Sequence, residues 1–416
     1  MKPLLLAAAL LAAPAWAQPA LRFAFDGPPA AGELAVQPDT AYSRERGHGF
    51  EPGAPRNAAG QPAFFSVDLP EGNYRVTATL GDRDASDTTL KAELRRLMLD
   101  GVRLPAGRSE TRSFIVNLRT ADIAAAPGVA AGRVTLKERE IASEAWAWDR
   151  RLTLEINGSR PALTHLLIEP VALPTVYLLG DSTVADQPGE PYASWGQMLP
   201  LLFKPTVAVS NQAESGETLR DSLARRRLDK ILSTLRPGDT VLLQFGHNDQ
   251  KQQRDGSGDA ATYRAELRTH AERILARGGV PVVVSSMERR RFDAQGRLQP
   301  SLGEYADAAR AVAQQMRLAF IDLHAMSLRF YAALGPERSQ QAHPVNGGRL
   351  DNTHHNGYGA LQLARLVALG LRDARVPVAG ALRDDLGAIS PDQPQPPEQF
   401  HVAASPGFTQ QRPLGD

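Results

Sequence analysis

Hydrophobic and polar residues follow two different patterns along the chain, and the change falls near residues 170–175. In the first part, short runs rich in β-branched and aromatic residues recur at close spacing, and turn signals such as Asp-Gly and Asn-Gly separate several of them. Because no long helical pattern interrupts these runs, residues 18–171 are predicted to form an antiparallel β-sandwich. The clearest runs span residues 64–69, 74–80, 113–118 and 152–156.

The second part alternates short apolar runs with longer segments of helical pattern. The apolar runs span residues 176–179, 207–209, 241–245, 280–284 and 320–323. The helical segments span about 219–235, 263–277 and 304–317. This alternation predicts a parallel sheet with helices on both faces, which we assign to residues 172–381. The remaining residues, 382–416, are rich in Pro, Gln and Ala and are predicted to be an extended or irregular tail.

The chain begins with the features of an export signal. Lys2 is followed by an almost uninterrupted run of Leu and Ala from Leu4 to Pro14 and then by Ala15-Trp16-Ala17. This pattern predicts a signal peptide over residues 1–17. A membrane anchor is the alternative, but the run is short against the roughly 20 apolar residues that span a bilayer. We therefore expect a secreted or periplasmic protein without membrane contact after cleavage.

Composition excludes several other kinds of protein. The 416 residues contain no cysteine, which excludes disulfides, thiol catalysis and cysteine metal sites. The net charge of +1 gives no electrostatic reason to expect a nucleic-acid partner. The length exceeds that of a usual single domain and agrees with two folded parts. The oligomeric state does not follow from any of these features.

Four short segments in the second part carry residues suited to acyl transfer. The first three follow apolar, strand-like runs, and the fourth lies in a loop further on. The carboxyl ends of parallel strands, and the loops beyond them, are where open α/β sheets place their active sites. Together the segments supply a nucleophile, an oriented base and donors to an oxyanion. They are Gly180-Asp181-Ser182-Thr183, Asn211-Gln212-Ala213-Glu214-Ser215-Gly216, Gly246-His247-Asn248-Asp249 and Asp351-Asn352-Thr353-His354.

Ser182, His354 and Asp351 are the candidate catalytic residues. A serine hydroxyl is a poor nucleophile until a base takes its proton, and a neutral imidazole such as His354 can accept and return that proton. Asp351, three residues earlier, can hold the other ring N–H and fix the tautomer. Taken singly, Ser182 could be a structural turn residue and Asp351 an N-cap of the helix expected near Tyr358. His355 is an alternative base, but the spacing to Asp351 favours His354.

Three groups are candidate donors to the oxyanion: the side-chain amide of Asn248 and the backbone N–H groups of Gly216 and Ser182. Asn248 and Gly216 also have simpler explanations, a loop hydrogen bond and turn geometry respectively.

The neighbouring pair His354-His355 suggests a metal site, but no further histidine or carboxylate cluster flanks it at ligand spacing. We therefore predict no metal.

The four segments resemble the conserved blocks of the SGNH, or GDSL-type, hydrolases over about residues 175–373. The forms Gly-Asp-Ser-Thr, Phe-Gly-His-Asn-Asp and Asp-Asn-Thr-His-His-Asn-Gly-Tyr-Gly-Ala are similar to the rhamnogalacturonan acetylesterase branch. The resemblance implies a flavodoxin-like α/β/α fold and no metal or organic cofactor. It also implies a triad of Ser182, Asp351 and His354 with an oxyanion hole of Ser182, Gly216 and Asn248.

Two features of the resemblance bear on the substrate. Glu217-Thr218 follows Gly216, whereas many members of the branch carry Arg-Ser at that place. The aromatic-plus-glycine segment of the family is present as 194–199. Its Trp195 is expected to bind substrate or to belong to the core.

Residues 18–171 are reminiscent of the galactose-binding-like β-sandwiches attached to bacterial pectin esterases. Trp146 and Trp148 alternate along a strand-like segment and would face the same side. They are expected to form a sugar-stacking surface or to pack in a core or between domains. Because all catalytic candidates lie after this region, its deletion is expected to leave hydrolysis of a small ester largely intact.

The sequence therefore predicts a serine carbohydrate esterase that removes O-acetyl groups from a plant cell-wall polysaccharide, with the pectin rhamnogalacturonan as the favoured substrate. An acetylxylan esterase, or another SGNH esterase or lipase, is the alternative among enzymes. A carbohydrate-binding protein on an inactive hydrolase scaffold is the alternative from another class. The complete set of catalytic candidates argues against an inactive scaffold.

Overall fold

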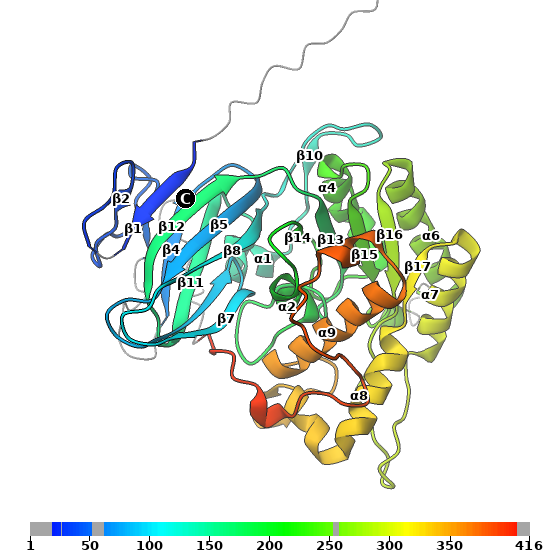
Figure 1. Cartoon of the computed structure of the whole chain (residues 1–416). Helices are drawn as coiled ribbons and strands as arrows, with labels where there is room; N and C mark the ends of the chain where they lie inside the picture. Colours follow the sequence, from blue (N-terminus) through cyan, green and yellow to red (C-terminus); the bar gives the residue numbers. More distant parts are fainter. Residues whose placement is uncertain (1–18, 26, 52–61, 253–257, 406–416) are drawn as a thin grey trace, which may run out of the picture.

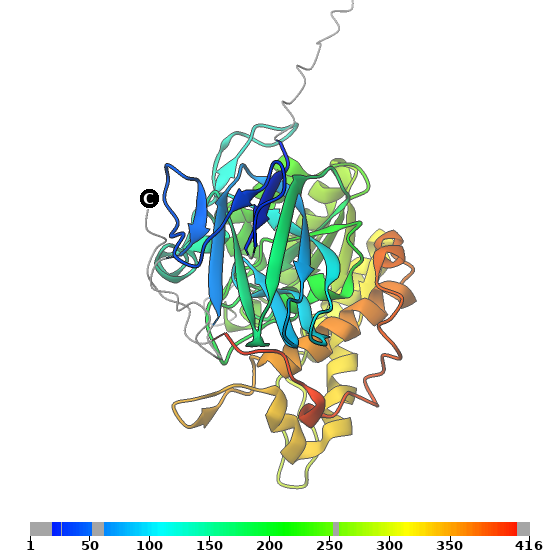
Figure 2. The same cartoon turned by 60° about the vertical axis from the view of Figure 1, so that its left-hand side comes forward.

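A computed structural model describes residues 19–25, 27–51, 62–252 and 258–405. A β-sandwich and a larger α/β part lie side by side in it (Figures 1 and 2). The predicted signal peptide, residues 1–17, lies outside the described residues. Within those residues, no helix is long and apolar enough to cross a membrane.

Two five-stranded sheets form the sandwich. Every neighbouring pair of strands in them is antiparallel except β1 and β2, which are parallel. One sheet has the order β2 (Leu34–Ala35), β1 (Leu21–Ala24), β12 (Leu163–Pro170), β5 (Gly72–Leu80) and β8 (Glu110–Leu118). The other has the order β3 (His48–Phe50), β4 (Ala63–Asp68), β11 (Arg151–Arg160), β6 (Ser86–Ala92) and β7 (Arg96–Leu104).

The two sheets share one apolar core. Phe23 and Val76 from the first sheet and Phe65 and Leu154 from the second are fully buried in the same cluster. Along β5 buried residues alternate with partly exposed ones, which is the pattern of a strand with one face turned to a core. The predicted sandwich is thus present, while its likeness to galactose-binding domains stays a prediction.

The α/β part is built on five parallel strands in the order β14 (Ala208–Asn211), β13 (Thr175–Gly180), β15 (Thr240–Gln244), β16 (Val280–Val284) and β17 (Ala319–Ile321). In chain order this is 2-1-3-4-5, the flavodoxin-like arrangement. The predicted parallel sheet is confirmed. Its strand order reverses at β13, and such a switch point is where open α/β sheets bind ligands.

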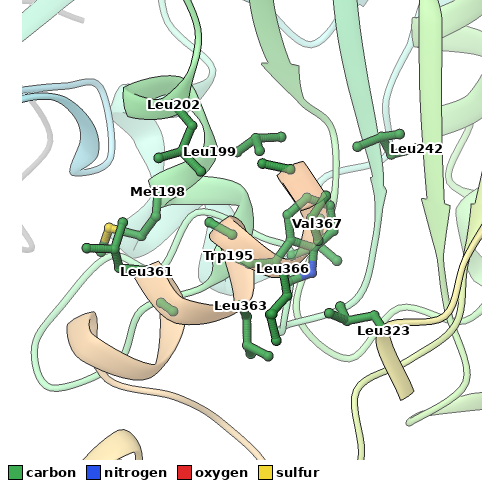
Figure 3. Packing of buried hydrophobic residues seen from close by; sticks show 14 of the residues in the cluster. Trp195, Met198, Leu199, Leu202, Leu242, Leu323, Leu361, Leu363, Leu366 and Val367 are labelled. Atoms are coloured by element: carbon green, nitrogen blue, oxygen red, sulfur yellow. The ribbon is translucent and has the colours of Figure 1, made fainter. Parts of the chain in front are cut away.

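Alternate residues of the parallel strands point to two apolar layers. Val176 and Leu178 of β13 pack in one cluster, whereas Tyr177 and Leu179 pack in another. The first layer is formed with α2 (Trp195–Met198), α8 (Leu323–Arg338) and α9 (Gly357–Asp373), as the close-up of Trp195 and its neighbours shows (Figure 3). The second is formed with α3 (Leu219–Ala224), α4 (Arg227–Thr234), α6 (Ala260–Ala276) and α7 (Gly303–Met316).

The helix predicted over 219–235 is two helices. α3 ends at Ala224, α4 begins at Arg227, and Arg226 between them has a φ of 64°, which a continuous helix cannot contain. The guanidinium of Arg226 donates to the carbonyls of Ala130 and Ala131. The break therefore coincides with a contact to the first part of the chain.

The first part also contains a segment that is not β structure. Short strands β9 (Asp122–Ile123) and β10 (Gly132–Arg133) are followed by α1 (Glu138–Ser143) and a 3₁₀ turn, Ala145–Ala147. Trp146 lies in that turn and Trp148 just after it, so the strand predicted there is wrong. Both indoles are buried in the apolar layer that also contains α4, and the guanidinium of Arg119 lies 4.4 Å from the Trp148 ring centre. Neither tryptophan is available to stack on a sugar.

The described part of the tail, residues 382–405, has no strand and one 3₁₀ turn, Pro397–Gln399, and it runs back to the sandwich (Figure 1). Near its end the hydroxyl of Ser405 donates to the carboxylate of Glu155 on β11. Lys91 of β6 donates to the carbonyl of Ala403 at 2.6 Å. The predicted irregular tail thus joins the α/β part to the sandwich.

Replacing His270 is expected to change how stability depends on pH. His270 is fully buried on α6, with Nε2 2.8 Å from the Ser222 hydroxyl and Nδ1 2.7 Å from the Glu266 carbonyl. Burial lowers its pKa to about 4, against roughly 6.5 in an unfolded chain. Between those values the unfolded chain binds more protons, so this histidine makes the folded state less stable as the pH falls from about 6.5 towards 4.

The measurement is the free energy of unfolding at pH 7 and pH 5 for the natural chain and for His270→Gln. Burial raises the pKa values of Glu214 and Asp249, which stabilises the folded state as the pH falls, so the natural chain alone does not isolate the histidine. The natural chain should lose more stability than the variant between the two pH values. Equal losses would contradict the expectation.

Candidate active site

Ser182 lies in the turn that follows the central strand β13. Asp181 is buried beside it and accepts hydrogen bonds from the backbone N–H and the hydroxyl of Thr183, at 3.0 and 2.7 Å. On its other side, the second oxygen of Asp181 lies 3.3 Å from Nδ1 of His247. A side chain at Gly180 would stand 2.5 Å from the Gln244 carbonyl, so the close approach of β13 and β15 needs glycine here. These contacts fix the turn that presents Ser182.

His354 and Asp351 meet Ser182 from the loop before α9. Ser182 Oγ lies 2.9 Å from His354 Nε2, and His354 Nδ1 donates to Asp351 at 2.7 Å. The other oxygen of Asp351 accepts from the backbone N–H groups of Thr353 and His354. Burial alone would raise the pKa of Asp351, but these hydrogen bonds outweigh it and hold the pKa well below its usual range. Asp351 is therefore ionised and fixes the tautomer in which Nε2 faces Ser182 as an acceptor.

His355 faces the other way. It is buried, its Nε2 lies 2.7 Å from the Tyr331 hydroxyl, and burial holds its pKa well below the usual range. The structure therefore joins Ser182 to His354 and does not join it to His355. Tyr192 lies edge-on to the His354 ring with centres 5.8 Å apart, a neighbour that the sequence did not indicate.

The two histidines should fail in different ways when replaced. His354→Ala removes the group that would accept the serine proton, so kcat should fall by about 10³-fold or more while the thermal midpoint changes little. His355→Ala leaves a cavity and a buried Tyr331 hydroxyl without its partner, so it should lower the free energy of unfolding by about 2 kcal/mol or more. Kinetics and thermal unfolding of both variants check this, and a folded His355→Ala that is as inactive as His354→Ala would contradict it.

Gly216, in the loop after β14, and Asn248, which follows β15, lie at the same edge of the sheet. The N–H of Glu214 in the loop after β14 donates to the Gly180 carbonyl at 3.1 Å, beside the turn that holds Ser182. Asn248 follows β15, and its amide donates to the Glu217 carbonyl at 3.1 Å, next to Gly216. Gly216 has a φ of 75°, a conformation that favours glycine. Their role as oxyanion donors stays a prediction.

One side chain that the sequence did not single out links these two segments. The amide of Gln187 donates to the Ser182 carbonyl at 2.7 Å and to the Ser215 hydroxyl at 3.2 Å. It thereby holds the nucleophile turn against the residue before Gly216. No local motif marks Gln187, because its partners lie on separate turns of the fold.

Trp195 does not reach the site surface. Its side chain is fully buried between the parallel sheet and α9 (Figure 3), and its indole N–H donates to Gln244 at 2.7 Å. The expectation that Trp195 binds substrate is therefore wrong, because no atom of the ring is open to solvent. Trp195 belongs to the apolar core, which was the other expectation for this residue.

Three buried carboxylates behind the Gly216 loop bring oxygen atoms within 4.8 Å of one another, as metal ligands do. They belong to Glu140, Glu144 and Glu214. Arg139 donates to Glu144 and to Glu214, each at 2.8 Å, and Arg227 donates to Glu140 at 2.5 Å. Because a guanidinium group donates to each of the three carboxylates, we interpret the cluster as an ion-pair network.

Comparison with known proteins matches residues 178–360 to the GDSL-like lipase/acylhydrolase family. The rhamnogalacturonan acetylesterase RhgT of Bacillus subtilis is 39% identical over 49% of this chain and 91% of its own length. The uncharacterized esterase YxiM of the same organism is 27% identical over 82% of this chain and 87% of its own length. The alignment with the crystal structure of YxiM covers 86% of this chain and 99% of the YxiM chain, with a TM-score of 0.48 and 25% identity.

The family match and the similarity to RhgT confirm the resemblance that the four segments predicted. The matched range begins at Leu178 of β13, before the Ser182 turn, and ends just after His354 and His355, so it contains the candidate triad and the candidate oxyanion donors. The chain belongs to the GDSL-like lipase/acylhydrolase family, as a hydrolase of the rhamnogalacturonan acetylesterase type, and is a carboxylic ester hydrolase.

Proposed function

We propose that the protein removes O-acetyl groups from rhamnogalacturonan by a serine esterase mechanism. The observation that carries this proposal is the chain of hydrogen bonds from Asp351 through His354 to the Ser182 hydroxyl, at 2.7 and 2.9 Å. RhgT, the relative named as a rhamnogalacturonan acetylesterase, supports the substrate.

In the proposed reaction, Ser182 Oγ attacks the carbonyl carbon of the acetyl group while His354 Nε2 takes its proton. The N–H groups of Ser182 and Gly216 and the amide of Asn248 donate to the oxyanion that forms. The carbonyl re-forms as the sugar oxygen leaves with the proton from His354, and Ser182 keeps the acetyl group. Water activated by His354 then attacks the acetyl-serine and releases acetate. Asp351 stays ionised and stabilises the imidazolium in both steps.

Acetate release from a panel of polymers tests the substrate. The natural chain is incubated with acetylated rhamnogalacturonan, acetylated homogalacturonan and acetylated xylan at equal acetyl content, with Ser182→Ala as the control for each. Release should be fastest from rhamnogalacturonan. Preferential release from xylan would replace the proposed substrate by that of an acetylxylan esterase, and no release from any polymer would favour the binding-protein alternative.

We also propose that the chain is exported, since its first residues have a charged start, a Leu and Ala run and an Ala-x-Ala site. Expression with and without residues 1–17 in a bacterial host checks this. The full chain should accumulate outside the cytoplasm with Gln18 as its first residue, and the shortened chain should remain inside.

A further inference from the structure

A segment of the first part of the chain packs against the loop that contains Gly216. It runs from Lys137 through α1 and leaves the sandwich between β10 and β11. The ammonium group of Lys137 donates to the Ser215 carbonyl at 2.7 Å and lies 3.3 Å from a carboxylate oxygen of Glu217. Lys137 therefore holds the loop on both sides of Gly216.

Glu217 links this contact to the second candidate donor. Its carboxylate is fully buried, 3.1 Å from Nε of Arg227 and 3.5 Å from Nε of Arg225, besides the contact with Lys137. Its backbone carbonyl accepts from the Asn248 amide. The buried side chain of Glu217 thus fixes the position of this residue. Glu217 adjoins Gly216 in the chain, and its backbone carbonyl orients the Asn248 amide.

The rest of the segment holds the loop from the same side. Arg139 donates to Glu214 at 2.8 Å, and Glu140 accepts from Arg227, the arginine that also binds Glu217. Gly216 itself has no side chain, and the Lys137 ammonium lies 3.7 Å from the place where its Cβ would stand. The position of the Gly216 N–H is therefore set by its neighbours in the loop.

We propose that Lys137 is a positioning residue for the oxyanion hole, supplied by the first part of the chain. Donors lower the barrier only if they already point to where the oxyanion forms, so a loosened loop should weaken the transition state more than the bound substrate. This inference rests on the proposed function, because it takes Gly216 and Asn248 to be the donors.

Lys137→Met should lower kcat for p-nitrophenyl acetate by about 10-fold to 100-fold, less than the loss of a whole donor, while KM changes by less than about twofold. Glu217 keeps Arg225 and Arg227 in this variant, so the fold should persist. Lys137→Arg, which retains a charged donor, should recover most of kcat. Lys204→Met is the matched control, since it breaks an exposed ion pair with Asp384 and should leave kcat unchanged.

Two outcomes separate this inference from the proposed function. If the natural chain and Ser182→Ala do not differ in activity, the proposed function fails. If they differ and Lys137→Met keeps the natural kcat, only the positioning role fails. Lys137→Gln, which keeps a donor for Ser215, is measured beside Lys137→Met, and the thermal midpoint of each variant is determined. A fall in kcat that follows the midpoint and that Lys137→Arg does not recover would also overturn the proposal.

Discussion

Ser182→Ala is expected to lower kcat for a small acetate ester by about 10⁶-fold, to a level close to that of a mock preparation, because serine hydrolases have no substitute for the nucleophile. The fold should remain, since the hydroxyl's partner His354 is held independently by Asp351 and the neighbouring turn is held by Asp181 and Gln187. Removal of one oxyanion donor, as in Asn248→Ala, should cost only about 10²–10³-fold. The order of the two losses is part of the expectation.

The measurement is acetate release under single-turnover and steady-state conditions, with thermal unfolding of each variant. The thermal midpoint of Ser182→Ala should lie within a few degrees of the natural value. A folded Ser182→Ala that still releases acetate well above the mock preparation would exclude Ser182 as the nucleophile. A loss no larger than that of Asn248→Ala would exclude it as well.

The sequence predicted the parts of the site that depend on local spacing and on strand ends. Asp351 and His354 are three residues apart and meet on one turn, and the structure joins them at 2.7 Å. Residues after β13, β14 and β15 come together because the carboxyl ends of parallel strands share one edge of a sheet. Alternation of apolar runs with segments of helical pattern along the chain was sufficient to predict a parallel sheet with helices on both faces.

The sequence did not predict features that depend on partners far along the chain. Nothing near Arg226 indicates a helix break, because the carbonyls that its guanidinium contacts belong to Ala130 and Ala131. The contact of Lys137 with Ser215 spans 78 residues and lies between two parts of the fold. Trp146 and Trp148 were assigned to a strand from their alternation, but a 3₁₀ turn also fits two residues so close together.

Deletion of residues 18–171 is expected to leave a chain that does not fold, contrary to the sequence-based expectation of an intact esterase. Arg96 is fully buried and donates to buried Asp186 at 2.8 Å, and Glu140 forms a similar pair with Arg227. The deletion removes one partner of each pair and opens the contact that buried both pairs, so the two parts are held together by charges that neither part satisfies alone.

The same deletion exposes apolar surface. Phe64, Leu94 and Trp146 share one buried cluster with Leu228 and Ile231 of α4, so the α/β part would lose the cover of that layer. The shortened chain should therefore be insoluble, or lack cooperative thermal unfolding, and should not hydrolyse even p-nitrophenyl acetate. Full-length Ser182→Ala, which is expected to be folded and inactive, is the control that separates loss of chemistry from loss of structure. A soluble shortened chain that unfolds cooperatively and hydrolyses the small ester at the natural rate would show that the α/β part folds without the sandwich, and it would also remove the basis for a positioning role of Lys137.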